Sequence, residues 1–295
     1  MKTPLRYAGG KTRAIKIITP YVEKYDKIIS PFIGGGSLEV YWASQLKKEV
    51  IGYDIFDTLV NFWNVLLEQP NDLYNELIKI KPNDEEFRRI KEILLRLDKT
   101  QEMLKDWKTD HYKREDIIKL DNLTLAAYYY FNHNTSYGPG FLGFSSSVYC
   151  KEDTWIKQTN KIKDFKCENL SVFNKTFDES IKLHNKDFLY LDPPYYLGGD
   201  NNKMYKGLYP IGNIDVHHSG FDHELLRDLL LKHEGDFVLS YNNCEVINEW
   251  YKDFEIVYPK WAYGFGNGNK NIGDTRRKKN NKMTKDSHEV LIIKR

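Results

Sequence analysis

Short apolar runs recur along the chain, each bounded by turn-forming or charged residues, and this pattern predicts strands. The runs occupy residues 27–30, 49–53, 188–191, 237–240, 255–257 and 290–293. Helical patterns lie next to two of these runs, because residues 37–46 and 222–233 place their apolar side chains on one helical face. Strands that alternate with helices predict an α/β fold built on a largely parallel, doubly wound sheet.

The middle of the chain has a different pattern. Residues 56–125 carry a charged, amphipathic helical pattern with few strand signals, punctuated by Pro70 and Pro82. Within it, residues 84–106 place apolar side chains at helical spacing, as the core face of a small helical domain would. Residues 128–149 are aromatic and polar and contain several Gly and Pro residues, which predicts an ordered, exposed hairpin or loop. We therefore expect a helical insertion within the α/β fold.

Composition limits the class of protein. The chain has 295 residues, 41% of them hydrophobic, which is enough to bury at least one sizeable core. No apolar run approaches the roughly 20 residues that span a bilayer, so we expect a cytoplasmic protein without membrane contact. Cys150, Cys167 and Cys244 are isolated from one another, which argues against a disulfide framework and against a cysteine metal site.

Total charge does not identify a partner. The 44 basic and 42 acidic residues give a formal net charge of only +2. Basic residues are nevertheless concentrated in residues 270–285, which include Arg276, Arg277 and Lys278 against the single acid Asp274. Such a stretch suits contact with a phosphate backbone, but a solvated loop has the same composition, and the sequence leaves both readings open.

A glycine-rich turn follows the first predicted strand. Gly34, Gly35 and Gly36 stand between that strand and the helical pattern that begins at Ser37. Adjacent glycines permit positive φ and let the backbone approach a ligand at the carboxyl edge of a parallel sheet, although a tight strand-to-helix turn would also use them. Asp54 ends the next strand about 20 residues later, where nucleotide-binding folds place a carboxylate on the ribose hydroxyls. The two features together favour a nucleoside site.

Asp192, Pro193, Pro194 and Tyr195 directly follow the apolar strand at residues 188–191. The two prolines lack N–H donors, so the end of this strand presents carboxylate and carbonyl acceptors. An aryl amine is a poor nucleophile because its lone pair is delocalised into the ring. Acceptors on its N–H bonds, from the Asp192 carboxylate and the Pro193 carbonyl, favour a pyramidal nitrogen that can attack a sulfonium methyl group. Tyr195 would then stack on the base.

Two further clusters carry weaker signals. In the N-terminal Gly turn, Tyr7 could cover a ligand, and Lys11 could hold either a ligand carboxylate or a phosphate. A group of histidines, His217, His218 and His223, lies near Asp222, but the spacing fits no standard metal site. We expect Asp222 to cap the helix that follows it, and we predict no metal.

In motif order, the sequence resembles the Dam-type N6-adenine DNA methyltransferases over nearly its whole length. Residues 7–11 look like that family's aromatic-Ala-Gly-Gly-Lys entry motif and residues 31–37 like its cofactor loop. Residues 192–195 are its catalytic tetrad unaltered. The Ser-Tyr-Asn sequence at residues 240–242 and the closing residues 289–292 sit where the family has a strand-end polar motif and a final strand.

The resemblance implies a Rossmann-like class I methyltransferase sheet in residues 1–57 and 153–295, with an inserted, mainly helical target-recognition domain in residues 58–152. It also implies base flipping, S-adenosylmethionine as methyl donor and S-adenosylhomocysteine as product. The implied catalytic residues are Asp192, Pro193, Pro194 and Tyr195. The implied donor-binding residues are Tyr7, Ala8, Gly9, Lys11, Phe32, Ile33, Gly34, Gly35, Gly36, Ser37, Asp54, Ile55, Phe177 and Asp192.

We expect contacts with double-stranded DNA from the loop at residues 132–149. Asn132 and Asn134 could read adenine in the major groove, and Tyr137 or Phe141 could wedge into the gap left by a flipped base. A self-packed loop whose Asn residues cap turns is the alternative. The expected DNA-contacting residues are Asn132, Asn134, Ser136, Tyr137, Phe141, Arg276, Arg277 and Lys278.

The sequence leaves several alternatives open. The same fold could act on cytosine N4 or on adenine in RNA, and a DNA-binding regulator that has lost turnover would keep the same architecture. A cognate restriction endonuclease is a candidate partner. The sequence indicates neither the recognised site nor the oligomeric state.

Overall fold

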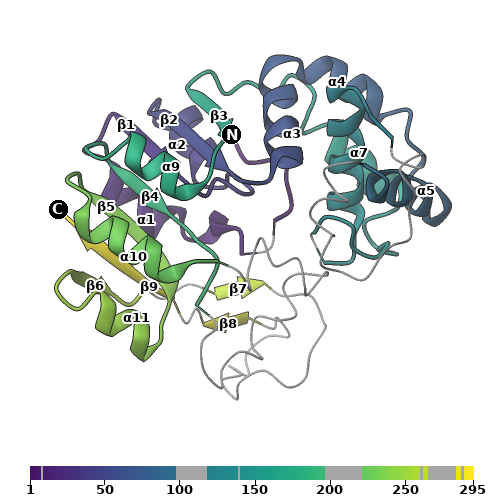
Figure 1. The fold of residues 1–295 in the computed structure, drawn as a ribbon. Helices are drawn as coiled ribbons and strands as arrows, with labels where there is room; N and C mark the ends of the chain where they lie inside the picture. The colour runs from purple at the N-terminus through teal and green to yellow at the C-terminus, as the bar shows by residue number, and fades with distance from the viewer. Residues whose placement is uncertain are drawn as a thin grey trace.

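A sheet of seven strands lies at one end of the molecule, and a group of helices packs beside it (Figure 1). The computed structural model describes residues 1–7, 9–97, 118–138, 140–196, 221–259, 262–264, 284–286 and 289–295. The strands of this sheet are β1 (Lys27–Ser30), β2 (Glu49–Asp54), β3 (Leu170–Asn174), β4 (Leu189–Leu191), β5 (Phe237–Asn242), β6 (Glu255–Val257) and β9 (Glu289–Lys294).

The strand order is β3-β2-β1-β4-β5-β9-β6. Strands β1 to β5 pair in parallel, and the order reverses between β1 and β4, which is where doubly wound sheets open their ligand crevice. Strand β9 is antiparallel to both of its neighbours, so its first residue, Glu289, lies opposite Asn242 at the carboxyl end of β5. The sheet confirms the predicted Rossmann-like α/β fold.

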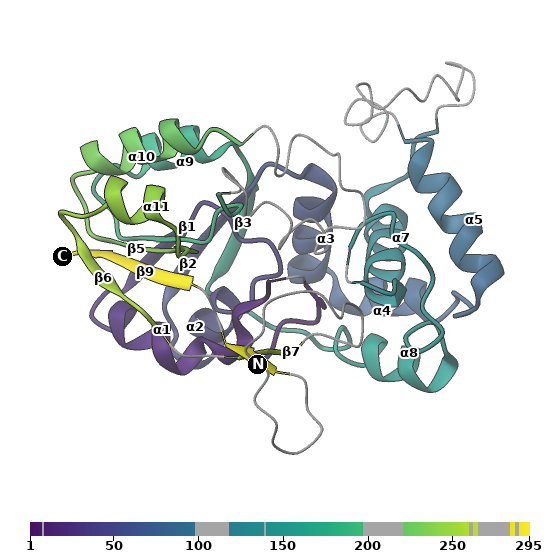
Figure 2. The same ribbon diagram turned by 90° about the horizontal axis from the view of Figure 1, so that it is seen from below.

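Successive residues of the central strands contribute side chains to two apolar layers, one on each face of the sheet. Ile28 and Val238 belong to one layer, while their neighbours Ile29 and Leu239 belong to the other. Helices α1 (Ile15–Val22) and α2 (Glu39–Gln45) cover the first face. Helices α9 (Phe177–Leu183), α10 (His223–Lys232) and α11 (Glu245–Trp250) cover the second, as the view from below makes clear (Figure 2).

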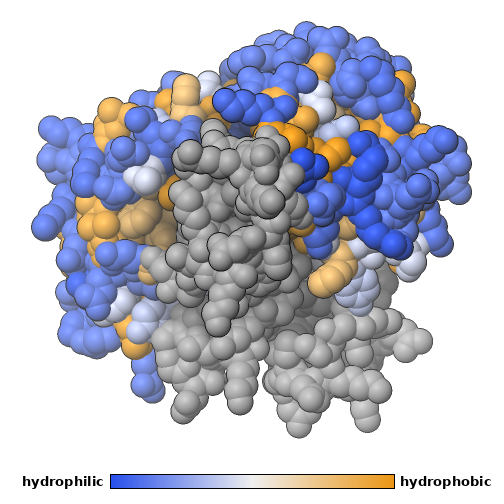
Figure 3. Space-filling model, turned by 45° about the vertical axis from the view of Figure 1, so that its right-hand side comes forward, coloured by the Kyte–Doolittle hydropathy of each residue, from blue (hydrophilic) through white to orange (hydrophobic). Residues whose placement is uncertain are grey.

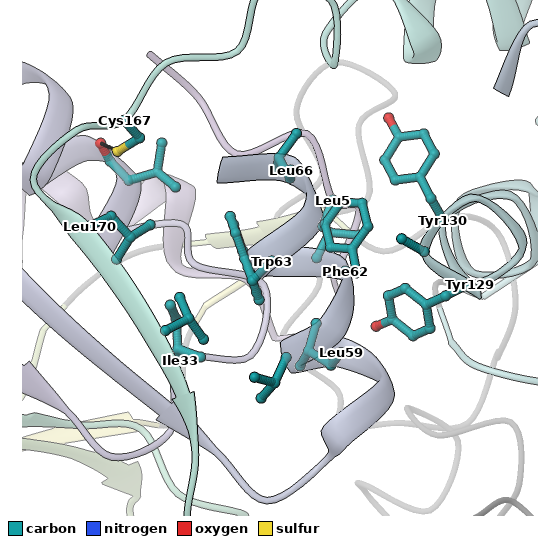
Figure 4. Packing of buried hydrophobic residues seen from close by; sticks show 14 of the residues in the cluster. Leu5, Ile33, Leu59, Phe62, Trp63, Leu66, Tyr129, Tyr130, Cys167 and Leu170 are labelled. Carbon is teal, nitrogen blue, oxygen red and sulfur yellow. Dashed lines mark hydrogen bonds between the residues drawn. The ribbon is translucent and has the colours of Figure 1, made fainter. Parts of the chain in front are cut away.

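The helices beside the sheet include those of the predicted insertion, and the last of them begins only where that insertion was expected to end. They are α3 (Asp57–Glu68), α4 (Pro70–Leu77), α5 (Asp84–Leu95), α7 (Asn122–Thr135) and α8 (Glu152–Thr159). Helix α3 joins them to the sheet, because Trp63 faces the sheet side while Phe62 stacks on Tyr130 of α7 with ring centroids 5.4 Å apart (Figure 4). One apolar core therefore runs from the sheet into the helices. The division at residues 58–152 stays a prediction.

Local signals explain where several helices begin. Pro70 starts α4, where its missing N–H is harmless. Asn83 and Asp121 cap α5 and α7, and each side chain accepts a backbone N–H from the first turn. Thr176 begins α9 with a reciprocal capping box. Asp222 caps α10 as predicted, since its carboxylate accepts the N–H of Leu225 at 2.8 Å.

Two sequence predictions need correction. No strand was expected at residues 170–174, yet β3 forms there at the sheet edge, with Leu170 and Val172 buried and the apolar Phe173 exposed. The expected hairpin or loop at residues 128–149 is wrong for its first part, because α7 continues to Thr135. Nearly the whole C-terminal half of α7 is buried, so it lacks the polar stripe by which an amphipathic helix is recognised.

A separate antiparallel pair, β7 (Ala262–Gly264) and β8 (Thr284–Asp286), stands near the end of the chain. Among the described residues, no helix has the length and apolar character needed to cross a membrane. The described residues also contain no group of three or more His, Cys, Asp or Glu side chains arranged to hold a metal ion.

Candidate active site

The Asp-Pro-Pro-Tyr segment lies at the carboxyl end of β4, in the middle of the sheet. Asn242, at the end of the neighbouring β5, holds this segment by a pair of hydrogen bonds: its Oδ1 accepts the N–H of Tyr196 at 2.8 Å and its Nδ2 donates to the Tyr196 carbonyl at 3.0 Å. Pro193 is buried and Asp192 is half-buried. The Ser-Tyr-Asn motif thus fixes the strand end that carries Asp192.

Lys11 is the partner of Asp192. Its ammonium donates to Asp192 Oδ1 at 2.8 Å, to the Tyr195 hydroxyl at 3.0 Å and to Glu289 Oε1 at 3.4 Å. Burial raises the pKa of Asp192, and the Lys11 ammonium opposes that rise by favouring the charged carboxylate. Because Lys11 is only 4% exposed, its ammonium points into the site and not toward a phosphate on the surface.

The glycine-rich turn and Asp54 meet at the carboxyl ends of β1 and β2. Gly34 N donates to Asp54 Oδ2 at 3.1 Å, and Phe56 N donates to Asp54 Oδ1 at 2.9 Å. Gly34 and Gly36 adopt φ of +45° and +60°, the left-handed region that favours glycine. Burial raises the pKa of Asp54 to about 6, and the backbone N–H groups of Phe56 and Gly34 oppose that rise by favouring the charged carboxylate.

Tyr7 lies on the glycine-rich turn. A Cβ atom at Gly35 would overlap the Tyr7 side chain, and one at Gly36 would lie 2.7 Å from the Trp63 ring. Trp63 also donates its indole N–H to the Gly34 carbonyl at 3.0 Å. The glycines are therefore required by neighbouring aromatic side chains as well as by any ligand, a reason that the sequence pattern did not indicate.

Aromatic side chains also gather beyond the carboxyl end of β1. Phe32 follows β1 and stacks on Phe177 of α9 with ring centroids 5.8 Å apart, and Phe221 packs against both rings. Ile55, directly after Asp54, is exposed. Asp178, the acid next to Phe177, pairs with Lys182 at 2.8 Å on the surface of α9. Its carboxylate therefore stabilises that helix.

The DNA-contacting residues predicted in α7 are buried, which corrects that prediction. Asn132 and Asn134 are 0% exposed. The Oδ1 atom of Asn132 accepts the N–H of Leu142 at 2.7 Å, and that of Asn134 accepts the N–H of Arg6 at 2.9 Å. Both side chains therefore hold the fold together, and direct reading of a base by either one is wrong for this structure.

Two more predicted DNA contacts are also internal. Ser136 is buried, and its hydroxyl donates to the His133 carbonyl at 2.9 Å. Phe141 is half-buried and packs edge-on against Phe56 with ring centroids 5.1 Å apart, so its ring lies against the core. Tyr137 is different, because it is 67% exposed. Of the residues predicted at this loop, Tyr137 keeps its place on the surface.

The entry segment links the site to the recognition helix. Tyr7 stacks on His133 of α7 with ring centroids 5.4 Å apart, and the Arg6 carbonyl contacts His133 Nε2 at 2.7 Å. Burial lowers the pKa of His133 to about 4, so its ring is neutral. Arg6 also lies over the Tyr149 ring, 3.2 Å from its centroid. Sequence spacing predicted none of these contacts.

The structure thus brings together Asp192, Tyr195 and Lys11 in one cluster, and Tyr7 with Gly34, Gly35, Gly36 and Asp54 in another. Ala8, Arg276, Arg277 and Lys278 lie outside the described residues. Sequence reasoning missed two buried acids, Glu289 and Glu39, which are each 3% exposed. No local motif marks them, because a lone Glu beside an apolar run has the pattern of a surface residue.

Glu39 gives a prediction about stability. Its Oε1 accepts the Ser30 hydroxyl at 2.8 Å, and burial, aided by the nearby Asp192 charge, raises its pKa from 4.5 to about 7. The folded protein therefore keeps a proton that the unfolded chain loses, and stability falls as pH rises from about 4.5 to about 7. Glu39→Gln should stabilise the protein at pH 8 by on the order of 3 kcal/mol.

Guanidinium denaturation of both proteins at pH 5 and pH 8 checks this prediction. At pH 5 the wild-type carboxyl is already protonated in the folded state, so we expect the two free energies of unfolding to lie closer together. An equal difference at the two pH values would mean that titration of Glu39 is not its cause.

Comparison with known proteins decides the family. Residues 7–265 match the family of D12 class N6 adenine-specific DNA methyltransferases. This protein belongs to that family. The methyltransferase is 25% identical over 264 residues to the Type II methyltransferase M1.LlaDCHI of Lactococcus lactis subsp. cremoris, a match that covers 85% of this chain and 84% of that protein. It is also 23% identical over 294 residues to the Type II methyltransferase M.FokI of Planomicrobium okeanokoites. That match covers 94% of this chain but only 42% of M.FokI.

Membership confirms the sequence prediction that the protein is an adenine-specific DNA methyltransferase. The family implies S-adenosylmethionine as methyl donor. The observed cluster fits such a donor, because a half-buried carboxylate, Asp54, and an adjacent exposed apolar residue, Ile55, stand at the strand end where nucleoside-binding sheets hold a ribose and its base.

Proposed function

We propose that this methyltransferase acts on an adenine extruded from a short duplex DNA site, and that the Asp192 carboxylate and the Pro193 carbonyl accept the two protons of its N6 amine. The Lys11–Asp192 ion pair of 2.8 Å carries the proposal. It keeps a charged acceptor at a strand end where two prolines remove competing N–H donors. Acceptors on both N–H bonds release the nitrogen lone pair from the ring and direct it toward an electrophile.

The proposed donor-holding residues are those that the family resemblance implies. S-adenosylmethionine supplies an electrophilic methyl group on a sulfonium centre. We propose that Asp54 binds its ribose hydroxyls and that Ile55 and Phe177 contact its adenine ring, since Ile55 is exposed directly after Asp54 and Phe177 stacks on Phe32 after β1. The full proposed set is Tyr7, Ala8, Gly9, Lys11, Phe32, Ile33, Gly34, Gly35, Gly36, Ser37, Asp54, Ile55, Phe177 and Asp192.

Tyr195 is proposed to stack on the extruded base. Its ring lies 6.4 Å from that of Tyr241, at an interplanar angle of 29°, and its hydroxyl is bound by Lys11. A ring held at both its face and its hydroxyl presents a fixed plane to a base. Once the amine carries the methyl group it loses a proton readily, and Asp192 is the nearest carboxylate to receive it. No metal takes part in this scheme.

The hairpin after α7 is the proposed wedge into DNA. Ser136 and Ser145 form an antiparallel bridge, and Tyr137 N donates to the Phe144 carbonyl at 2.7 Å, so the turn between these residues is held at its base. Tyr137 and Phe144 are both exposed at this turn. The space-filling view of the helical side shows a largely hydrophilic surface broken by patches of apolar side chains (Figure 3). We propose Tyr137 as the wedge, with Arg276, Arg277 and Lys278 on the phosphates.

Tyr137→Ala should weaken binding to duplex DNA by roughly fivefold to 100-fold, because stacking of an aromatic side chain on a base contributes about 1–3 kcal/mol. Fluorescence anisotropy with a labelled duplex measures the effect. Tyr258→Ala is the matched control, since Tyr258 is 58% exposed beside β6, at the far edge of the sheet. Equal losses in the two variants would contradict a specific role for Tyr137.

Mapping methylated adenines tests the proposed function as a whole. The protein is expressed in cells without adenine methylation of their own, and the genome is sequenced for N6-methyladenine. We expect methylation at one short sequence. Methylcytosine instead, methylation of RNA alone, or no modification by a protein that still binds DNA would each contradict the proposal.

A restriction endonuclease of the same specificity is the proposed partner. The proposal is supported by two relatives, which both carry the designation Type II methyltransferase. An extract of the source cells should then cleave unmodified DNA at the mapped site and spare DNA that the methyltransferase has modified. Absence of such cleavage would remove the partner and leave the methylation proposal intact.

A further inference from the structure

Glu289 is a buried acid that the scheme above does not use. It is the first residue of β9, and the reversed direction of this strand brings it to the edge where β4 and β5 end. The side chain is 3% exposed. Burying a carboxylate so completely is unfavourable unless its oxygens are bound, so its contacts should indicate its role.

The Glu289 carboxyl group contacts the Tyr195 hydroxyl and its neighbours. Oε1 accepts hydrogen bonds from the Tyr195 hydroxyl and from Lys11 Nζ, the latter at 3.4 Å, and Oε2 accepts the Ser240 hydroxyl at 3.4 Å. The same ammonium also holds Asp192. Glu289, Lys11 and the Tyr195 hydroxyl thus form a closed triangle next to the proposed amine acceptor, with β9, the entry segment and the β4 end each supplying one member.

We infer that Glu289 is a positioning residue that anchors the Tyr195 hydroxyl and thereby fixes the plane on which the target adenine stacks. A tyrosine ring rotates about its χ bonds unless its far end is held, and the Glu289 oxygen that accepts the Tyr195 hydroxyl holds that end. Ser240 in turn orients the carboxylate. The inference rests on the proposed stacking role of Tyr195, and it assigns to the last strand a part in catalysis that no motif suggested.

Three variants test the inference in methylation assays on duplex DNA carrying the mapped site. Glu289→Met keeps the side-chain length but removes the acceptor, and we expect kcat to fall by about tenfold or more, because small misplacements of reacting groups are costly. Glu289→Gln keeps an acceptor oxygen and should lose only about threefold. Tyr195→Phe, which removes the hydroxyl alone, should match Glu289→Met. Affinity for S-adenosylhomocysteine, measured by calorimetry, should change by less than about threefold in all three.

The double variant Glu289→Met/Tyr195→Phe decides whether the two residues act together. If Glu289 acts through the hydroxyl, kcat of the double variant equals that of the worse single variant. Multiplied losses, or a kcat of Tyr195→Phe within about threefold of wild type, would overturn the inference. The second outcome applies even if Glu289→Met does not fold. A wild-type protein that failed to methylate DNA would instead contradict the proposed function itself.

Discussion

Replacing Asp192 by alanine is expected to reduce methyl transfer by about 10²–10³-fold or more, because the amine then lacks a preorganised acceptor. The protein should still fold, since Lys11 keeps a second carboxylate, Glu289, at 3.4 Å. S-adenosylhomocysteine and duplex DNA should therefore still bind measurably. Single-turnover transfer of a labelled methyl group gives the rate, and calorimetry gives the affinities.

Asp192→Asn is the matched control for this prediction. The amide keeps one acceptor oxygen at the same length but loses the charge that pairs with Lys11. We expect a rate between those of the wild type and the alanine variant. Normal turnover by Asp192→Ala would rule out the proposed activation of the amine, whatever the asparagine variant does.

Gly36→Ala is expected to destabilise the protein by about 2–4 kcal/mol. Part of the loss is backbone strain, since a φ of +60° is unfavourable for a residue with a Cβ atom. The remainder is overpacking, because the new methyl group would lie 2.7 Å from the Trp63 ring. Displacing Trp63 would also disturb its hydrogen bond to Gly34, so we expect weaker binding of S-adenosylhomocysteine as well.

Thermal unfolding and calorimetry measure both effects of Gly36→Ala. A fall in Tm of roughly 3–6 °C is expected for a protein of this size. Gly138→Ala serves as the control, because a Cβ atom there would meet nothing within 4 Å. A Gly36→Ala protein as stable as the control would show that Trp63 and the turn adapt without strain.

The residues that carry the proposed chemistry were predictable because they stand at strand ends. An apolar run that stops at an acid marks both a strand and its carboxyl edge, which is how Asp54 and Asp192 could be assigned to one side of the sheet. The resemblance added Tyr7 and Lys11. Direct contact between Lys11 and Asp192 joins residues 181 positions apart, and no local pattern predicts such a pair.

The recognition segment was harder to predict for a physical reason. Asn132 and Asn134 look like surface residues, but in the buried C-terminal half of α7 a polar side chain can be satisfied by backbone groups of other segments. The same holds for Glu289 and Glu39, which a sequence pattern assigns to the surface by residue type. Tyr137 was predicted correctly as an exposed residue because Gly and Pro nearby end the helix.

A structure of the protein with S-adenosylhomocysteine and a duplex carrying the mapped site tests the central claim most directly. We predict that the target adenine lies outside the helix stack, with its N6 atom about 3 Å from a carboxylate oxygen of Asp192 and from the Pro193 carbonyl oxygen. Its ring should rest against Tyr195. An adenine whose N6 atom faces other groups, with the Asp192 carboxylate remote from the base, would contradict the account.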